Sequence, residues 1–126
     1  MSTKRTIALI AHDGRKAEMV AFVKDYHDIL KEMNLIATGT TGSYIQKTGL
    51  EVTKKLSGPQ GGDAQIAAMA AEGTVEAILF FRDPLGKHPH EPDVQMLLRI
   101  CDVHNVPLAT NPATAKLLLL GMTDAK

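Results

Sequence analysis

The chain has 126 residues, with 14 acidic and 14 basic side chains, a net charge of zero and a single cysteine. Its length suits one domain with its own core. The balanced charge excludes the strong field that draws a protein to nucleic acid or to an anionic membrane. A lone cysteine can form no internal disulfide, which fits a reducing cytoplasm. We therefore expect a single domain over residues 1–126 whose partner is a small molecule.

The first apolar run predicts a strand rather than a targeting segment. Only five apolar residues, Ile7 to Ala11, precede His12, and this is too few for a signal-peptide core or a membrane span. The run is continuous and rich in branched residues, which is typical of a strand covered on both faces. We therefore expect a cytoplasmic protein without a membrane partner.

The segment after Gly14 predicts one long helix that ends at Asn34. Its apolar residues recur at steps of four and three and would form one stripe against the sheet: Met19, Val23, Tyr26, Leu30 and Met33. Residues 35–37 predict a second strand, which runs into a turn over residues 38–42. A brief helix over residues 43–48, stopped by Gly49, would complete this unit.

The middle of the chain combines a weak strand with a glycine-rich loop. Residues 50–56 are a weak strand candidate, and the glycines and proline of residues 57–62 predict a loop. Asp63 is placed to cap a helix that Gly73 would terminate. The mostly apolar residues 75–81 predict a further strand.

The C-terminal third predicts two helices and one strand. Pro92 suits the first turn of a helix whose apolar stripe includes Cys101. Residues 106–109 would form the last strand, and Asn111-Pro112 would begin a helix that ends at Gly121. Five short apolar strands separated by helices predict a three-layer α/β/α domain with a mainly parallel sheet. Because ligands bind outside the carboxyl ends of such strands, we expect the functional residues there.

Polar side chains follow four of the predicted strands. The residues that we expect at this edge of the sheet are His12, Asp13 and Lys16, then Thr38 to Gly42, then Ser57 to Asp63, and finally Asp83 with His88, His90 and Asp93. Because these polar side chains would gather at one edge of the sheet, we interpret them as a functional site rather than as a chance arrangement.

The Thr38-Gly39-Thr40-Thr41-Gly42 segment predicts a phosphate-binding turn. Its glycines would let backbone N–H groups converge on an anion, and the threonine hydroxyls and the following helix would add donors. It lacks the spacing of nucleotide and dinucleotide sites, which favours a small phosphoester. The alternative is an ordinary strand-to-helix turn. Ser57, Gly58 and Lys16 at the same edge favour phosphate.

Neither histidine pattern predicts a metal site. His12-Asp13 ends a strand without further ligands, and His88-x-His90 has only short-range spacing without a completing partner. We therefore predict no metal and no cofactor. His27 and His104 are interpreted as solvated helix residues.

Asp63 has two interpretations, as a helix cap or as an acid with a tuned proton affinity. The second is favoured because Gly61-Gly62 permits close approach of a ligand and other acids crowd the same edge. A receiver-type phosphoacceptor is excluded. It would need paired acids after the first strand and a lysine after the fifth, but the next lysine is Lys116, inside a helix.

The chain resembles methylglyoxal synthases over nearly its whole length. The matching segments follow one another in order: residues 10–13, 37–42, 56–63, 80–85, 89–93 and 109–115. The resemblance implies a flavodoxin-like or methylglyoxal-synthase-like fold. It also implies a metal-free lyase that converts dihydroxyacetone phosphate to methylglyoxal and inorganic phosphate, a bypass of glycolysis. Further implications are a homohexamer and inhibition, including allosteric inhibition, by phosphate. Family members commonly extend further at the C-terminus than this chain does beyond Gly121.

The resemblance also assigns roles to individual residues. Asp63 becomes the catalytic base, with His12 and His90 at the substrate oxygens, and Asp13, Asp83 and Asp93 become supporting acids. The implied substrate- and phosphate-binding residues are Lys16, Thr38, Gly39, Thr40, Thr41, Gly42, Ser57 and Gly58, together with His12 and His90. The alternative is a non-catalytic ligand-binding domain like the regulatory part of carbamoyl phosphate synthetase. The acid and histidine set favours catalysis.

Overall fold

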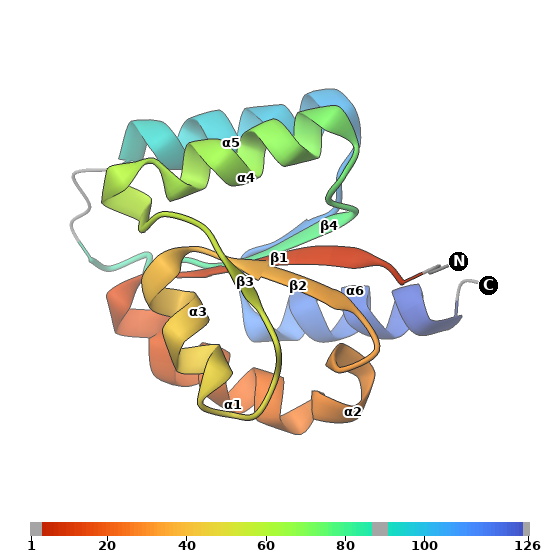
Figure 1. Ribbon diagram of the computed structural model, residues 1–126. Helices are drawn as coiled ribbons and strands as arrows, with labels where there is room; N and C mark the ends of the chain where they lie inside the picture. Colours follow the sequence, from red (N-terminus) through yellow and green to blue (C-terminus); the bar gives the residue numbers. More distant parts are fainter. Residues whose placement is uncertain (1–3, 87–90, 125–126) are drawn as a thin grey trace.

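Five parallel strands form one sheet in the order β3-β2-β1-β4-β5 (Figure 1). The structure, a computed structural model, describes residues 4–86 and 91–124. The strands are β1 (Thr6–Ala11), β2 (Asn34–Ala37), β3 (Thr53–Lys54), β4 (Ala77–Phe81) and β5 (Leu108–Ala109). The helices are α1 (Lys16–Asp25), α2 (His27–Leu30), α3 (Gly39–Gln46), α4 (Gly62–Glu72), α5 (Glu91–His104) and α6 (Pro112–Asp124), with short 3₁₀ turns η1 (Asp13–Arg15) and η2 (Gly58–Gln60).

Helices cover both faces of the sheet, as predicted. Figure 1 shows α4 and α5 on one face and α1, α2, α3 and α6 on the other. Successive residues of a strand point to opposite faces, so Ile7 and Leu9 of β1 join one core cluster while Ala8 and Ile10 join the other. This double burial explains the continuous apolar run of β1. The predicted three-layer α/β/α fold is confirmed.

The strand order reverses between β1 and β4. Ala11 at the end of β1 pairs with Phe81 at the end of β4, and Leu9 pairs with Ala37 at the end of β2. The carboxyl ends of these three strands therefore lie together, at the point where doubly wound sheets bind ligands. The order 3-2-1-4-5 also distinguishes this sheet from the flavodoxin order 2-1-3-4-5.

The long helix predicted up to Asn34 is wrong, because the chain breaks at Tyr26 into α1 and α2. The backbone amide of Asn34 donates to the Arg5 carbonyl at 2.8 Å, and β2 begins at Asn34. The chain must therefore turn back toward the sheet before this residue. Met33 lies after the second helix and packs against the core from there.

The Thr/Gly turn differs from its prediction, since residues 39–42 form the first turn of α3 and Thr38 occupies its N-cap position. The weak strand over residues 50–56 shortens to Thr53–Lys54, and the glycine-rich loop contains the 3₁₀ turn η2.

The predicted end of the last helix at Gly121 is also wrong. Helix α6 continues to Asp124, and its predicted cap is present, because the Thr114 amide donates to Asn111 Oδ1 at 3.0 Å. Gly49 and Gly73 stop their segments with positive φ, whereas Gly121 stays inside its helix. Among the described residues, no helix has both the length and the hydropathy that a membrane span requires.

Candidate functional site

A pocket of about 420 Å³ opens at the carboxyl ends of β1, β2 and β4. The predicted site residues that line it are His12, Asp13, Lys16, Thr38, Thr40, Ser57, Gly58, Asp63 and Asp83. The structure thus brings together residues from all four predicted segments. Gly39, Thr41 and Gly42 are absent from this lining. Of the remaining predicted residues, His90 lies outside the described residues, and Asp93 belongs to the first turn of α5.

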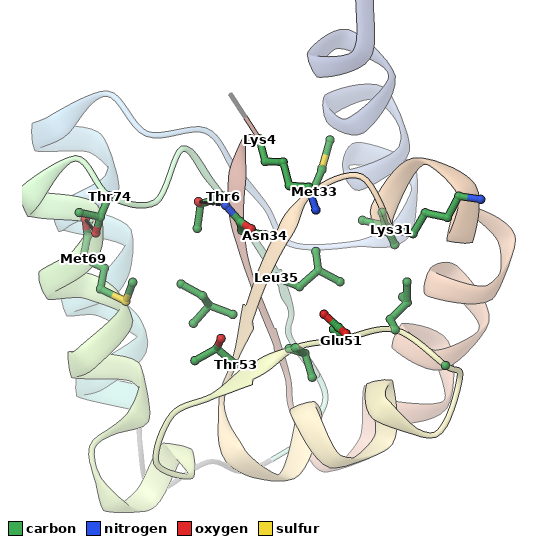
Figure 2. Close-up of a pocket in the computed structure, with 15 residues that line it drawn as sticks. Lys4, Thr6, Lys31, Met33, Asn34, Leu35, Glu51, Thr53, Met69 and Thr74 are labelled. Carbon is green, nitrogen blue, oxygen red and sulfur yellow. Dashed lines mark hydrogen bonds between the residues drawn. The ribbon is translucent and has the colours of Figure 1, made fainter. Parts of the chain in front are cut away.

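A larger cavity, of about 720 Å³, lies between the amino-terminal part of β2, the segment before β3 and helix α4 (Figure 2). None of the predicted site residues lines it. Its charged lining residues, Lys4, Lys31 and Glu51, are exposed. We therefore place the candidate site in the smaller pocket, which contains a buried carboxylate and clustered donors.

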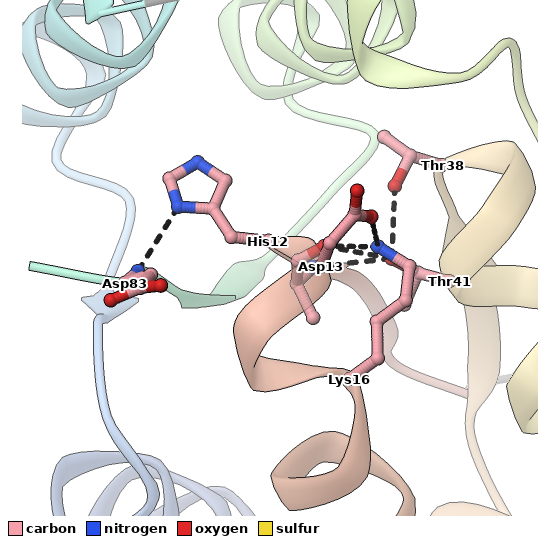
Figure 3. Close-up of polar contacts among 7 residues, drawn as sticks. His12, Asp13, Lys16, Thr38, Thr41 and Asp83 are labelled. Carbon is pink, nitrogen blue, oxygen red and sulfur yellow. Dashed lines mark hydrogen bonds and ion pairs between the residues drawn. The ribbon is translucent and has the colours of Figure 1, made fainter. Parts of the chain in front are cut away.

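Thr41 connects α3 to the end of β1. Its hydroxyl oxygen accepts a hydrogen bond from the Ala11 amide at 3.1 Å and lies 3.4 Å from the Ala11 carbonyl oxygen. The Thr38 hydroxyl donates to the hydroxyl oxygen of Thr41 at 3.3 Å (Figure 3). Thr41 is only 1% exposed. Its hydroxyl is therefore occupied inside the protein, whereas Thr38 and Thr40 line the pocket.

The backbone amides of the two glycines in this segment also donate hydrogen bonds within the protein. The Gly39 amide donates to the Leu56 carbonyl at 3.2 Å, and the Gly42 amide donates to the Thr38 carbonyl at 2.7 Å. A Cβ atom on Gly39 would lie 3.1 Å from the Lys55 carbonyl oxygen. The amides of Thr40 and Thr41 occupy the second and third positions of α3, where a helix supplies no internal acceptor. They are the backbone donors that a phosphate group at this helix end would use.

Lys16 carries the cationic group of the pocket. Its Nζ donates to the Ala11 carbonyl at 2.7 Å and to Asp13 Oδ1 at 3.0 Å (Figure 3). The Lys16 side chain is 11% exposed, whereas that of Asp13 is 98% exposed. An ammonium group has three N–H donors, so these two contacts fix its position and leave one donor to serve a ligand. Asp13 acts here as the ion-pair partner of Lys16.

His12 extends from the end of β1 and contacts the end of β4. Its Nδ1 accepts a hydrogen bond from the Asp83 amide at 3.0 Å (Figure 3), and its ring packs edge-on against Phe80 with centroids 5.1 Å apart. Oδ1 of Asp83 in turn accepts from the amides of Leu85 and Gly86, at 3.1 and 3.2 Å. These bonds form a compact turn after β4.

Asp63 lies in the first turn of α4 and is only 6% exposed. It does not cap the helix, because Gly61 occupies the N-cap position with φ of 107°. A Cβ atom on Gly58 would lie 3.6 Å from Oδ1 and 3.7 Å from Oδ2 of Asp63. The glycine thus leaves space in front of the carboxylate. A buried carboxylate at the positive end of a helix, facing such space, is suited to proton transfer.

Gly62 fixes the approach of α4 to the loop before it. Its amide donates to the Ser57 carbonyl at 2.9 Å. A Cβ atom at this position would lie 1.9 Å from the Leu56 carbonyl oxygen, so no other residue fits without a backbone shift. The consecutive glycines therefore set the position of Asp63.

Gly14 and Gly86 line the pocket but were not among the predicted site residues. A Cβ atom on Gly14 would lie 2.6 Å from Asp83 Oδ2, a long-range contact that the sequence does not reveal. Gly86 had a detectable signal, because Asp83-Pro84-Leu85-Gly86 is a pattern typical of an Asp-initiated turn. Within residues 4–86 and 91–124, no group of three or more His, Cys, Asp and Glu side chains is arranged to hold a metal ion.

Comparison with known proteins identifies the family. The model of the MGS-like domain matches residues 18–110. The chain is 59% identical over 120 residues to the methylglyoxal synthase of Borreliella afzelii (strain PKo), with 94% of each chain covered. The chain belongs to the methylglyoxal synthase family. It is also 55% identical over 123 residues to the methylglyoxal synthase of Cupriavidus taiwanensis, with 97% of this chain and 92% of the relative covered.

The fold agrees with this membership. The crystal structure of methylglyoxal synthase from Elizabethkingia anophelis NUHP1 matches with a TM-score of 0.87 and 44% sequence identity, covering 92% of this chain and 77% of that one. The resemblance to methylglyoxal synthases predicted from the ordered segments is therefore confirmed.

Proposed function

We propose that this protein converts dihydroxyacetone phosphate to methylglyoxal and inorganic phosphate, as a carbon–oxygen lyase. The observation that carries the proposal is one pocket in which the buried Asp63 carboxylate lies with Lys16 and the amino end of α3, in a member of the methylglyoxal synthase family. The pocket thus combines a base, a cation and phosphate donors. These are the groups that the reaction needs.

The first step is removal of a proton from the hydroxymethyl carbon beside the ketone. Asp63 takes this proton, and the electron pair of the C–H bond becomes the carbon–carbon double bond of an enediolate. Negative charge then develops on the former ketone oxygen. His12 and Lys16 line the same pocket and serve as donors to the substrate oxygens. Carbonyl polarisation by these donors makes a carboxylate a sufficient base.

The second step breaks the bond between carbon and the phosphate oxygen. The π electrons of the enediolate expel phosphate when the phosphoester bond stands out of the enediolate plane, where orbital overlap is good. The enol that remains takes up a proton at its CH₂ carbon and loses the proton of its hydroxyl group, which gives methylglyoxal. Thr38 and the amides at the start of α3 hold the phosphate group and favour the charge on it as it leaves.

Several predicted residues keep supporting roles in this proposal. Thr40, Ser57 and Gly58 line the pocket as further substrate contacts, and Asp13 holds the ammonium group of Lys16. On the family resemblance alone, we propose that His90 lies at the second substrate oxygen and that Asp93 is a supporting acid.

Assembly and regulation belong to the same proposal. We propose a single domain over residues 1–126, a cytoplasmic location, a homohexamer and inhibition by phosphate, as the family resemblance implies. Exposed leucines on α6, Leu117 and Leu120, support contacts between subunits. Sedimentation analysis with and without phosphate tests the oligomer and its response to phosphate.

The decisive experiment incubates the purified protein with dihydroxyacetone phosphate and follows methylglyoxal and free phosphate together. We expect the two products in equal amounts. Tight substrate binding without either product would contradict the lyase and favour a ligand-binding domain of the carbamoyl phosphate synthetase type. Formation of glyceraldehyde 3-phosphate instead would show that the enediolate is reprotonated and that phosphate stays in the plane.

A further inference from the structure

The contact between His12 and the end of β4 determines where the imidazole proton lies. Nδ1 of His12 is 3.0 Å from the backbone nitrogen of Asp83, which lies 71 residues away in sequence. A backbone amide only donates hydrogen bonds, so Nδ1 must be the acceptor and carry no proton. The neutral imidazole then holds its proton on Nε2. Turning the ring over would set a carbon-bound hydrogen against the amide and lose this bond.

The Asp83 side chain holds the amide in position. Its Oδ1 accepts from the amides of Leu85 and Gly86, which closes the turn after β4. Its Oδ2 lies against Gly14, where a Cβ atom would approach to 2.6 Å. The carboxylate is therefore engaged with the backbone of its own turn and with the loop after β1. These contacts fix the peptide that points toward His12.

We propose that Asp83 is a positioning residue whose turn directs its own amide at His12 Nδ1 and so holds the imidazole as the neutral Nε2–H tautomer. This assigns Asp83 a different task from that of a supporting acid. The identity of the oxygen that Nε2–H meets, the carbonyl oxygen of the substrate, rests on the proposed function. The tautomer itself does not.

The chemical consequence is that His12 and Asp63 have different roles in the pocket. With its proton on Nε2 and its Nδ1 occupied by the Asp83 amide, His12 has no site from which to accept a substrate proton. It can only donate a hydrogen bond to the oxygen on which charge develops. Proton removal is then left to Asp63, whose carboxylate faces the space in front of Gly58.

Long-range ¹H–¹⁵N NMR of the ¹⁵N-labelled protein at neutral pH tests the tautomer directly. We expect the ring of His12 to show one unprotonated nitrogen at Nδ1 and one protonated nitrogen at Nε2. The His12→Gln variant assigns these signals by their disappearance. An averaged pair of tautomers, or a proton on Nδ1, would overturn the proposal. The measurement needs no turnover, so it stands apart from failure of the lyase activity.

Two substitutions of Asp83 separate positioning from acidity. Asp83→Asn keeps an Oδ1 acceptor for the turn but removes the charge, whereas Asp83→Ala removes both. We expect the Nε2–H signature to survive in Asn and to average in Ala. We also expect kcat to fall by about 10-fold or more in Ala relative to Asn, with a smaller change in KM. Equal losses in both variants with the tautomer unchanged would assign Asp83 to charge chemistry. Circular dichroism checks the fold of each, and if Ala does not fold, the wild-type tautomer still decides.

Discussion

The hydroxyl oxygen of Thr41 lies 3.1 Å from the backbone nitrogen of Ala11 and joins the first turn of α3 to the end of β1. The bond is buried, and loss of a buried partner costs about 1–3 kcal/mol. We therefore expect Thr41→Val to lower the free energy of unfolding by about this amount, as measured by urea denaturation. Thr41→Ser keeps the hydroxyl and should lose less. Full stability of the Val variant with weaker phosphate inhibition would make Thr41 a direct ligand.

Thr40 provides the contrasting case, because it is exposed and lines the pocket. We expect Thr40→Val to weaken competition by inorganic phosphate while the urea midpoint stays close to that of the wild type, since an exposed hydroxyl contributes little to folding. Inhibition constants for phosphate measure the effect. A large loss of stability without a change in inhibition would reverse the roles of the two threonines.

Asp63 should matter for turnover more than for binding. Asp63→Asn preserves shape but removes the basic oxygen, and we expect kcat to fall by about 10²–10⁴-fold, the usual contribution of a positioned base. KM should change much less. The matched control is Asp102→Asn, at an exposed acid on α5, which should behave as the wild type. Near-normal turnover in Asp63→Asn would move the base to Asp13 or Asp93.

Substitution by alanine is expected to have opposite effects on stability at Gly62 and at Gly121. Alanine at Gly62 would press against the Leu56 carbonyl oxygen at 1.9 Å. We expect a loss of stability of about 1–3 kcal/mol or more, together with a loss of activity as Asp63 moves. Gly121 lies inside α6 with no atom within 4 Å of a Cβ, so Gly121→Ala should gain about 0.5–1 kcal/mol. Thermal unfolding and activity of both variants test this pair.

The thiol of Cys101 makes the free energy of unfolding depend on pH. Burial is the main cause that raises the pKa of its thiol above 9.0, followed by the charge of Asp102. Because the folded state keeps the proton longer than the unfolded state, this contribution is present below pH 9.0 and is lost as the pH rises above it. We expect the stability difference between wild type and Cys101→Ala to shrink above that pH in urea titrations. A constant difference would contradict the assignment.

Burial on two faces explains which elements of the fold the sequence predicts. Strands β1 and β4 are covered by helices on both sides, so their apolar runs are continuous and recognisable. The edge strand β3 pairs with a single neighbour and its residues are exposed, which leaves little apolar signal. The break at Tyr26 is also hidden, because the spacing of apolar residues continues through both helices.

The candidate site, like the fold, could be predicted from the sequence only in part. Most of the polar residues that line the pocket could be predicted, because polar side chains at the carboxyl ends of parallel strands gather at one edge. Their contacts could not. Thr38 and Thr41 stand three residues apart and so share one side of α3, next to Ala11, whereas Thr40 lies on a different side. The amide that orients His12 leaves no trace in side-chain identity.

The pairing of β1 with β4 has a kinetic consequence. His12 follows one strand and Asp83 the other, 71 residues apart, and their contact forms only after these strands are aligned. Contacts of such separation form late relative to local helices, because a long loop must close first. In a refolding experiment, helical signal should therefore return before turnover does. The recovery of activity would then report the moment at which the two halves of the sheet join.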